Sequence, residues 1–193
     1  MVTVSTSTRA YHHGDLRPAL VNAALALVAE ADELSLRAVA RRVGVSATAV
    51  YRHFPDKDAL LTAIAKAGLA QLGAAQHAAY DAAGGGAAGF NATGVAYVRF
   101  ALANPALFRL IYAQPLDHAM ASGVGGDDDD AMTFLLANAA ALAPGGVDTR
   151  VFALQAWSVA HGLAMLMLDG AVPVDESMIA RVVDAHAMLG TGA

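Results

Sequence analysis

Apolar residues recur every three or four positions along nearly the whole chain, and no stretch keeps the strict alternation that marks a half-buried strand. This spacing gathers the apolar side chains along one side of a helix. The pattern therefore predicts an all-α fold of about nine helices. The expected helices cover residues 15–28, 35–43, 46–53, 56–82, 93–103, 105–112, 131–142, 148–168 and 175–189.

Glycine and proline mark where several of these helices begin or end. Gly44 ends the second helix, and Asn104-Pro105 opens the sixth. The cluster from Gly84 to Gly89 predicts a loop, because glycine costs a helix about 1 kcal/mol relative to alanine. The stretch 114–130, which ends in four consecutive aspartates, is expected to be the most mobile connection in the chain.

The composition is unusually apolar for a soluble protein. Hydrophobic residues make up 56% of the 193 residues, and the mean hydropathy is +0.46. A membrane-spanning helix needs about 20 predominantly apolar residues, whereas the longest apolar segment, 156–168, contains Ser158 and His161. Much of the apolar content is alanine, the best helix former. We therefore expect helix packing and a subunit interface rather than a membrane span.

The first ten residues lack the apolar core of a secretory signal, and the chain contains no cysteine. No disulfide framework is therefore expected, and a cytoplasmic location is the default.

Charge is distributed unevenly along the sequence. The net charge is −5 overall, but residues 1–70 carry a net charge of +2 and residues 71–193 a net charge of −7. A basic module attached to an acidic body is typical of proteins that bind nucleic acid.

Two short helices joined through Gly44-Val45 have the dimensions of a helix-turn-helix. With Ser46 as the N-cap, the second of these helices has two different faces. Val50 and Phe54 are four residues apart and point inward, while Thr48, Tyr51 and Arg52 lie on the opposite face. A hydroxyl, a phenol and a guanidinium are groups that read base edges or hold phosphates in a major groove.

Further basic residues flank this face. Arg37 and Arg41 form an i,i+4 pair on the preceding helix, and Lys57 opens the next one. From Ser35 to Lys57 the chain has five Lys or Arg residues and one acid. The resulting local charge of +4 suits a phosphate backbone.

The sequence L-S-L-R-A-V-A-R-R-V-G-V-S-A-T-A-V-Y-R-H-F-P-D-K-D-A-L-L, from Leu34 to Leu61, resembles the DNA-binding module of the TetR family of bacterial transcriptional regulators. The resemblance covers roughly residues 14–61. It implies a homodimer that binds a near-palindromic DNA operator, with repression as the usual mode. By position it implies DNA contacts from Ser35, Arg37, Ser46, Ala47, Thr48, Tyr51, Arg52, His53 and Lys57.

A second, shorter resemblance involves residues 11–17 and the segment Trp157-Ser158-Val159-Ala160-His161-Gly162. Both are similar to a TetR subgroup named for a Trp-His-Gly signature in its C-terminal domain. This resemblance implies a helical domain that binds an effector and dimerises. The expected organisation is an N-terminal arm over 1–13, a three-helix helix-turn-helix domain over 14–58, and an effector-binding and dimerisation domain over 59–193.

Large aromatic and methionine side chains of the C-terminal part are foremost core residues, but a subset could line a cavity for a small apolar effector. The candidate ligand-binding residues are Phe100, Phe108, Arg109, Tyr112, Phe134, Trp157, His161 and Met165. The last two helices offer more apolar surface than one small domain can bury, which favours a four-helix interface between two copies. The candidate interface residues are Val151, Leu154, Val159, Leu163, Ile179, Val182 and Val183.

Two other functional classes fit the sequence less well. An enzyme needs a convergent nucleophile and base or a metal cluster, yet the C-terminal part, 59–193, has no cysteine and only four histidines, His77, His118, His161 and His186, scattered along the sequence. A helical adaptor that binds only protein would not bind duplex DNA in a strongly salt-dependent way, whereas a regulator would. We therefore expect a ligand-responsive, dimeric DNA-binding regulator, most simply a repressor, and no enzyme.

Two short motifs could suggest metal ions. His12-His13 lacks the further ligands of a transition-metal site, and Asp127 to Asp130 lacks the ligand spacing of a calcium loop. No metal or cofactor is expected.

Overall fold

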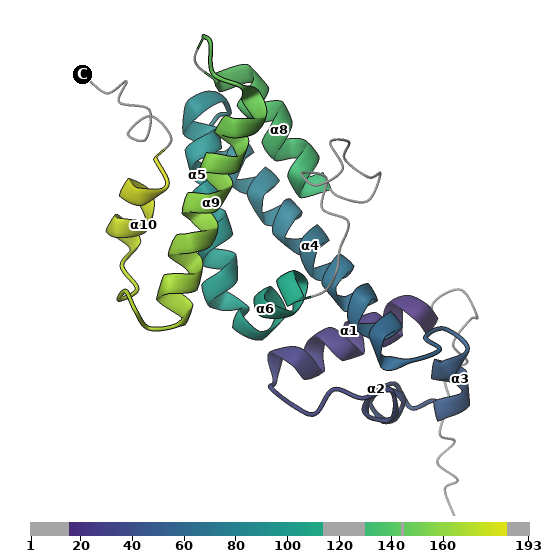
Figure 1. The fold of residues 1–193 in the computed structure, drawn as a ribbon. Helices are drawn as coiled ribbons and strands as arrows, with labels where there is room; N and C mark the ends of the chain where they lie inside the picture. The colour runs from purple at the N-terminus through teal and green to yellow at the C-terminus, as the bar shows by residue number, and fades with distance from the viewer. Residues whose placement is uncertain (1–15, 114–129, 144, 185–193) are drawn as a thin grey trace, which may run out of the picture. The chain divides into compact units, whose positions relative to one another are not determined.

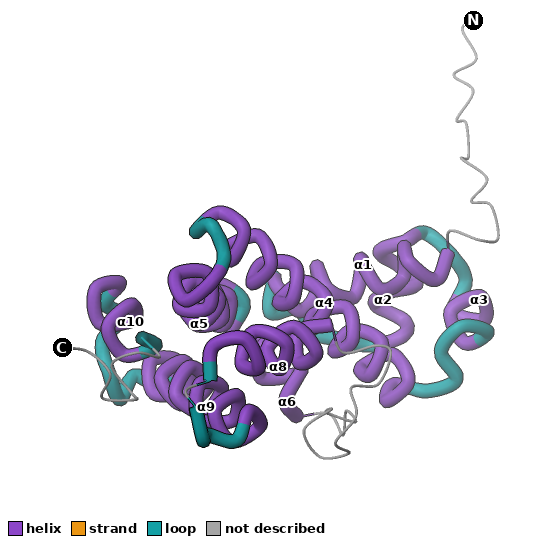
Figure 2. Tube along the Cα trace, turned by 90° about the horizontal axis from the view of Figure 1, so that it is seen from above, coloured by secondary structure: helices purple, strands orange, loops and turns teal. Residues whose placement is uncertain are grey.

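The computed structural model describes residues 16–113, 130–143 and 145–184. Within these ranges the chain forms nine α-helices. Figure 2 shows helices joined by loops and no strand in the described part of the chain, so the predicted all-α fold class is confirmed. The helices are α1 (Leu16–Ala29), α2 (Leu36–Val43), α3 (Ala47–Tyr51), α4 (Lys57–Ala82), α5 (Gly86–Ala103), α6 (Pro105–Ala113), α8 (Asp130–Leu142), α9 (Thr149–Leu168) and α10 (Glu176–Val182).

The chain divides into two compact units, one up to Ile64 and one from Ala65 onward, so that α4 contributes residues to both. In the N-terminal unit, α1 and α3 each pack against α2. The core of this unit consists of fully buried side chains from all four helices and from the residue Phe54. They include Leu20, Ala24, Val39, Val50, Phe54, Leu60 and Ile64.

In the C-terminal unit, α5 and α9 run side by side, with α8 and α10 packed against both (Figure 1). The rings of Phe90 on α5 and Phe152 on α9 stack with centroids 5.6 Å apart, and Ala139 of α8 and Ala153 fill the space beside them. Alanines at these crossings let the helices approach closely, which accounts for much of the apolar excess of the composition.

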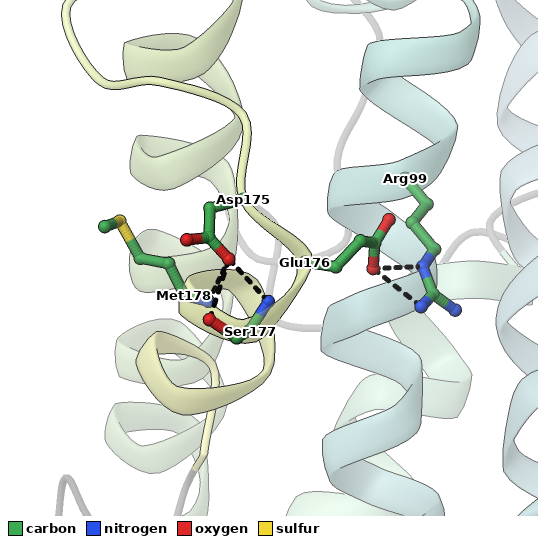
Figure 3. Close-up of polar contacts among 5 residues, drawn as sticks. All are labelled: Arg99, Asp175, Glu176, Ser177 and Met178. Atoms are coloured by element: carbon green, nitrogen blue, oxygen red, sulfur yellow. Dashed lines mark hydrogen bonds and ion pairs between the residues drawn. The ribbon is translucent and has the colours of Figure 1, made fainter.

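The short helix α10 is attached to this unit by both apolar and polar contacts. Ile179 and Val183 are buried. Figure 3 shows that the Asp175 carboxylate accepts hydrogen bonds from the backbone N–H groups of Ser177 and Met178, which caps the helix. In the same view, the guanidinium of Arg99 donates to a carboxylate oxygen of Glu176 at 2.6 and 2.9 Å, which joins α5 to α10.

The glycine cluster is not the loop that the sequence predicts, because α5 already begins at Gly86 instead of near Thr93. The turn is confined to Gly84, Gly85 and Gly86, which have φ angles of +81°, +73° and +59°. Gly89 lies inside the helix, where a Cβ would be 2.6 Å from a ring carbon of Tyr80 on α4. Its missing side chain therefore serves the close packing of α5 on α4.

Smaller differences occur at two helix ends. Helix α3 ends at Tyr51, two residues earlier than expected, with Arg52 as its C-cap. Helix α10 ends at Val182, and the rest of the expected last helix, 185–189, lies outside the described residues. The connection expected at 114–130 also lies outside them, except for Asp130, which begins α8.

Among the described residues, α9 is the one helix that is long and apolar enough to cross a membrane, judged by length and composition alone. Its most apolar window has a mean hydropathy of 1.6, and a third of that window is buried inside the subunit. The core helix of a soluble protein meets the same criterion, so this is weak evidence for a span.

Candidate functional site

The helix-turn-helix is fixed by three local contacts. The Ser35 hydroxyl accepts a hydrogen bond from the backbone N–H of Ala38 at 3.1 Å, which caps α2, and the Ser46 hydroxyl accepts one from Ala49 at 3.2 Å, which caps α3. Gly44 ends α2 in the left-handed region, with φ +78°, and donates its N–H to the carbonyl of Ala40. These contacts set the sharp turn between the two helices.

The two faces of α3 differ as the spacing indicates. Val50 is fully buried, whereas Thr48 and Arg52 are exposed and Tyr51 is 48% exposed. Ala47 and His53 are half-buried beside them. The hydroxyl, phenol and guanidinium therefore lie together on the outer surface of this unit.

A hollow lies beside this surface. Its walls are formed by Ser35, Leu36, Arg37, Tyr51, Pro55, Asp56 and Lys57. Arg37 and Lys57 are both exposed, so the hollow carries two cations at its edge. Asp56 is the acid that sequence reasoning left out of this site, and its Oδ1 accepts the N–H of Ala59 at 2.8 Å. Its position directly before a helix could have identified it as a cap.

One basic residue of this unit, Arg42, is held in an ion pair within the protein. Arg42 donates to both carboxylate oxygens of Glu30, with one distance of 2.6 Å, and this contact lowers the pKa of Glu30 and raises that of Arg42. The pair joins the end of α1 to α2. Arg42 therefore contributes little net charge to the surface, whereas Arg37, Arg41 and Arg52 are exposed.

The C-terminal unit contains a partly enclosed cavity with a free volume of about 50 Å³. Residues of α4, α5, α6, α8 and α9, together with Val183, form its walls. The lining residues are Leu69, Leu72, Gln76, Phe90, Thr93, Gly94, Tyr97, Tyr112, Ala131, Met132, Leu135, Ala156, Trp157, Ala160 and Val183.

A polar cluster forms one side of this cavity, with the Tyr97 hydroxyl at its centre. This hydroxyl lies 2.7 Å from the hydroxyl of Tyr112 and 2.8 Å from Nδ1 of His161, and it accepts the indole N–H of Trp157 at 3.2 Å. Burial raises the pKa of Tyr97 and lowers that of His161. The cluster is therefore uncharged at neutral pH.

The structure separates the candidate ligand residues into three groups. Tyr112 and Trp157 line the cavity, and His161 contacts it through Tyr97. Phe100 and Phe108 are buried away from the lining, and Met165 is half-buried outside it. Phe134 packs on His77 and Tyr80, and Arg109 is exposed, with its guanidinium 2.7 Å from Asp169.

Sequence reasoning missed Gln76, Thr93 and Tyr97 as lining residues. Gln76 and Thr93 are polar positions on the apolar stripes of α4 and α5, and both are buried. A buried polar residue inside such a stripe is the signal that could have identified them.

The candidate interface residues also differ in burial. Leu163, Ile179 and Val183 are buried inside the subunit, and Val159 is half-buried. Val151, Leu154 and Val182 are exposed, and so is Leu166, which the sequence pattern did not single out.

The described residues contain no group of three or more His, Cys, Asp or Glu side chains that could hold a metal ion. His12, His13, His118 and the acidic stretch 127–129 lie outside the described ranges.

Comparison with known sequences gives two family matches. Residues 20–64 match the family described as bacterial regulatory proteins, tetR family, and residues 90–187 match the tetracyclin repressor-like C-terminal domain. The Trp-His-Gly subgroup thus stays a prediction. No curated protein matches the chain significantly.

Several solved structures are similar to this chain over nearly its whole length. A protein of unknown function from Rhodococcus sp. RHA1 is 31% identical, with 94% of this chain and 98% of that chain covered and a TM-score of 0.75. A candidate transcriptional regulator from Pseudomonas aeruginosa PAO1 is 18% identical, with 98% of each chain covered and a TM-score of 0.68. A TetR family transcription regulator from Marinobacter aquaeolei VT8 is 20% identical, with 89% and 93% covered and a TM-score of 0.63. The last two show similarity of fold alone.

Proposed function

Because the chain belongs to the tetR family of bacterial regulatory proteins, which are DNA-binding transcription regulators, we propose that it is a homodimeric repressor that a small effector releases from its operator. The observation that carries this proposal is the exposed Thr48, Tyr51 and Arg52 surface of α3. Its opposite face is fully buried at Val50, so α3 presents these three side chains outward. No catalytic role is proposed, and the expected location is the cytoplasm.

The DNA contacts proposed for this surface divide by chemistry. Thr48, Tyr51 and Arg52 are suited to base edges and adjacent sugars in the major groove, with Ala47 allowing close approach and His53 at the edge. Arg37 and Lys57 border the hollow beside Tyr51, where exposed cations suit phosphates. Ser35 and Ser46 already accept backbone hydrogen bonds, so each would add only its hydroxyl hydrogen to a phosphate.

The test uses a duplex selected by the purified protein from a random pool. We expect Tyr51→Ala to weaken binding to this duplex about tenfold or more, because a base contact is worth about 1–3 kcal/mol. Arg42→Ala is the matched control, since Arg42 is exposed in the same unit but paired with Glu30. Equal losses of DNA affinity in both variants, measured at one salt concentration, would contradict the assignment of α3 as the recognition helix.

The proposed dimer surface lies along α9. Leu154, Ser158, Gly162 and Leu166 are spaced four residues apart and so lie on one side of the helix. Both leucines are nearly half exposed, Ser158 is exposed, and a Cβ at Gly162 would meet no atom of the subunit within 4 Å. Small residues between exposed leucines allow a second helix to approach closely. Val151 on α9 and Val182 on α10 are further exposed apolar side chains, and we include them in the proposed surface.

We expect Leu166→Glu to convert the dimer into monomers in sedimentation experiments, because it places a charge in an apolar contact. Val174→Glu is the control, since Val174 is even more exposed but lies outside α9 and α10. A dimer that survives Leu166→Glu and Leu154→Glu together would place the interface elsewhere.

We propose that an effector releases the protein from DNA by changing the distance between its two recognition helices. The recognition helices of the two subunits enter successive major grooves only when they lie about 34–36 Å apart. A ligand that prefers a form with another separation lowers DNA affinity by its differential affinity for the two forms. Helix α4 supports this coupling, since it carries Lys57 at its first residue and Leu69, Leu72 and Gln76 in the cavity wall.

A further inference from the structure

Among the described residues that line the cavity, Gln76 is the polar one whose side chain has no hydrogen-bond partner. Gln76 is 9% exposed and lines the cavity from α4. None of the hydrogen bonds among the described residues involves its amide. No side-chain nitrogen or oxygen of these residues is both sealed from solvent and unpaired, so the amide must border free space. A largely buried amide without a protein partner is unfavourable unless a ligand or water completes its hydrogen bonds.

The neighbouring polar groups are already engaged. The Thr93 hydroxyl donates to the carbonyl of Phe90 at 2.6 Å, and the Trp157 indole N–H donates to the Tyr97 oxygen. The Gln76 side chain, by contrast, still has two donor hydrogens and an acceptor oxygen available on one planar group. An amide or a similar group that both donates and accepts is the best complement to it.

Within the described part of the chain, the cavity lining carries no charge that could balance a charged ligand. None of its lining residues is an aspartate, glutamate, lysine, arginine or histidine. His161 contacts the polar cluster, and its burial lowers its pKa and keeps it neutral at pH 7. A carboxylate or an ammonium group would lose its hydration here without gaining a counter-ion, which strongly disfavours its binding.

The size of the cavity limits the ligand as well. A free volume of about 50 Å³ corresponds to roughly four water molecules. A one-ring molecule therefore requires only modest shifts of its walls. Met132 and Leu135 of α8 belong to these walls, and methionine adapts its shape easily.

We propose that this cavity binds an uncharged, one-ring molecule whose amide-like group pairs with the Gln76 side chain while its ring packs among the aromatic walls. This inference deepens the proposed function, on which it rests for the role of the cavity as the effector site. It assigns the chemical class of the effector and names Gln76 as the residue that selects it.

The experiment uses the full-length protein and four probes of the same size: benzamide, benzoate, benzylammonium and toluene. Trp157 is the only tryptophan of the chain and lines the cavity, so its single indole N–H signal in NMR reports binding directly. At pH 7 we expect benzamide to bind about tenfold or more tightly than either charged probe, because neither finds a counter-ion. Toluene should bind less tightly than benzamide, because it leaves Gln76 unpaired.

The variant Gln76→Leu tests the selecting residue. It should weaken benzamide about fivefold or more while toluene binds at least as tightly as before, since the site loses its unpaired amide. Gln71→Leu is the control, because Gln71 lies on the same helix but is exposed. If Gln76→Leu does not fold, as judged by its helical circular dichroism, Gln76→Met replaces it with the same expected outcome.

Several results would overturn the inference. These are benzoate or benzylammonium binding as tightly as benzamide, a preference for benzamide that persists without Gln76, or no binding of any neutral probe. These outcomes are independent of DNA. If benzamide binds through Gln76 yet leaves the affinity for the selected duplex unchanged, this inference stands and the proposed release by an effector fails.

Discussion

The hydroxyl oxygen of Tyr97 on α5 lies 2.8 Å from Nδ1 of His161 on α9, although the two residues are 64 positions apart in the sequence. The same hydroxyl lies near Tyr112 and Trp157, yet it has only one hydrogen to donate. It therefore accepts from at least one of its neighbours while it donates to another. Three helices are joined at this one oxygen, beside the cavity.

Removing this hydroxyl should destabilise the protein. Tyr97→Phe leaves Trp157, His161 and Tyr112 each without their contact to Tyr97, whereas Tyr112→Phe removes one of these three contacts. We expect Tyr97→Phe to lower the free energy of unfolding by about 1–3 kcal/mol, because the ring is retained and buried polar groups lose a partner. Urea unfolding followed by circular dichroism measures both variants. A larger loss for Tyr112→Phe would show that Tyr97 is not the centre of the cluster.

Stability should depend on pH through His161. Burial lowers its pKa in the folded state below the 6.5 of an unfolded chain, so the unfolded state binds the proton more readily. Stability is then complete above the unfolded pKa and falls as the pH drops below it. The groups facing His161, which are Tyr97, Tyr112, Phe108 and Trp157, carry no charge at these pH values.

The comparison is between the wild type and His161→Asn, whose amide oxygen can replace Nδ1 as an acceptor. Thermal unfolding of both proteins is measured at several pH values between about 7 and about 5. The stability of the wild type should fall more steeply over this range than that of His161→Asn. Parallel curves would mean that other groups cause the pH dependence.

A methyl group at position 89 should be costly. In Gly89→Ala the new Cβ would lie 2.6 Å from the Tyr80 ring, so ring or helix must shift, at a cost of about 1–3 kcal/mol. Thermal unfolding of Gly89→Ala, Tyr80→Leu and the double variant tests the cause. The double variant should be less destabilised than the sum of the single ones, because the clash needs both side chains. Additive losses would point to helix distortion at position 89 alone.

Lys57 should contribute to DNA affinity without reading sequence. We expect Lys57→Ala to weaken specific and random duplexes by similar factors and to reduce the slope of log affinity against log salt by about 1, as the loss of one phosphate contact does. Fluorescence anisotropy at several salt concentrations gives this slope. A variant that loses affinity only for the selected duplex would make Lys57 a base-reading residue.

The helix-turn-helix could be predicted closely from the sequence because its signals are local. Ser35, Gly44 and Ser46 act on backbone groups within four residues, so their effect does not depend on distant parts of the chain. Val50 and Phe54 then identify the buried face of α3 by spacing alone.

The cavity could not be predicted in the same way. The cavity is lined by residues of α4, α5, α8 and α9, which are far apart in the sequence. Gln76 becomes a lining residue only through the packing of these helices. The start of α5 was predicted wrongly for a related reason. Helix propensity counts against Gly89, but the Tyr80 ring, nine residues earlier, occupies the space where its side chain would be.

That single position also bears on how wide the cavity is. The two helices that meet at Tyr80 and Gly89 both continue into the lining of the cavity, one through Gln76 and the other through Thr93 and Tyr97. The hydrogen atom that Gly89 carries in place of a methyl group thus helps to set the separation of two helices that line the cavity. Relatives with a bulkier residue at this position should have a cavity of different dimensions and should therefore bind molecules of another size.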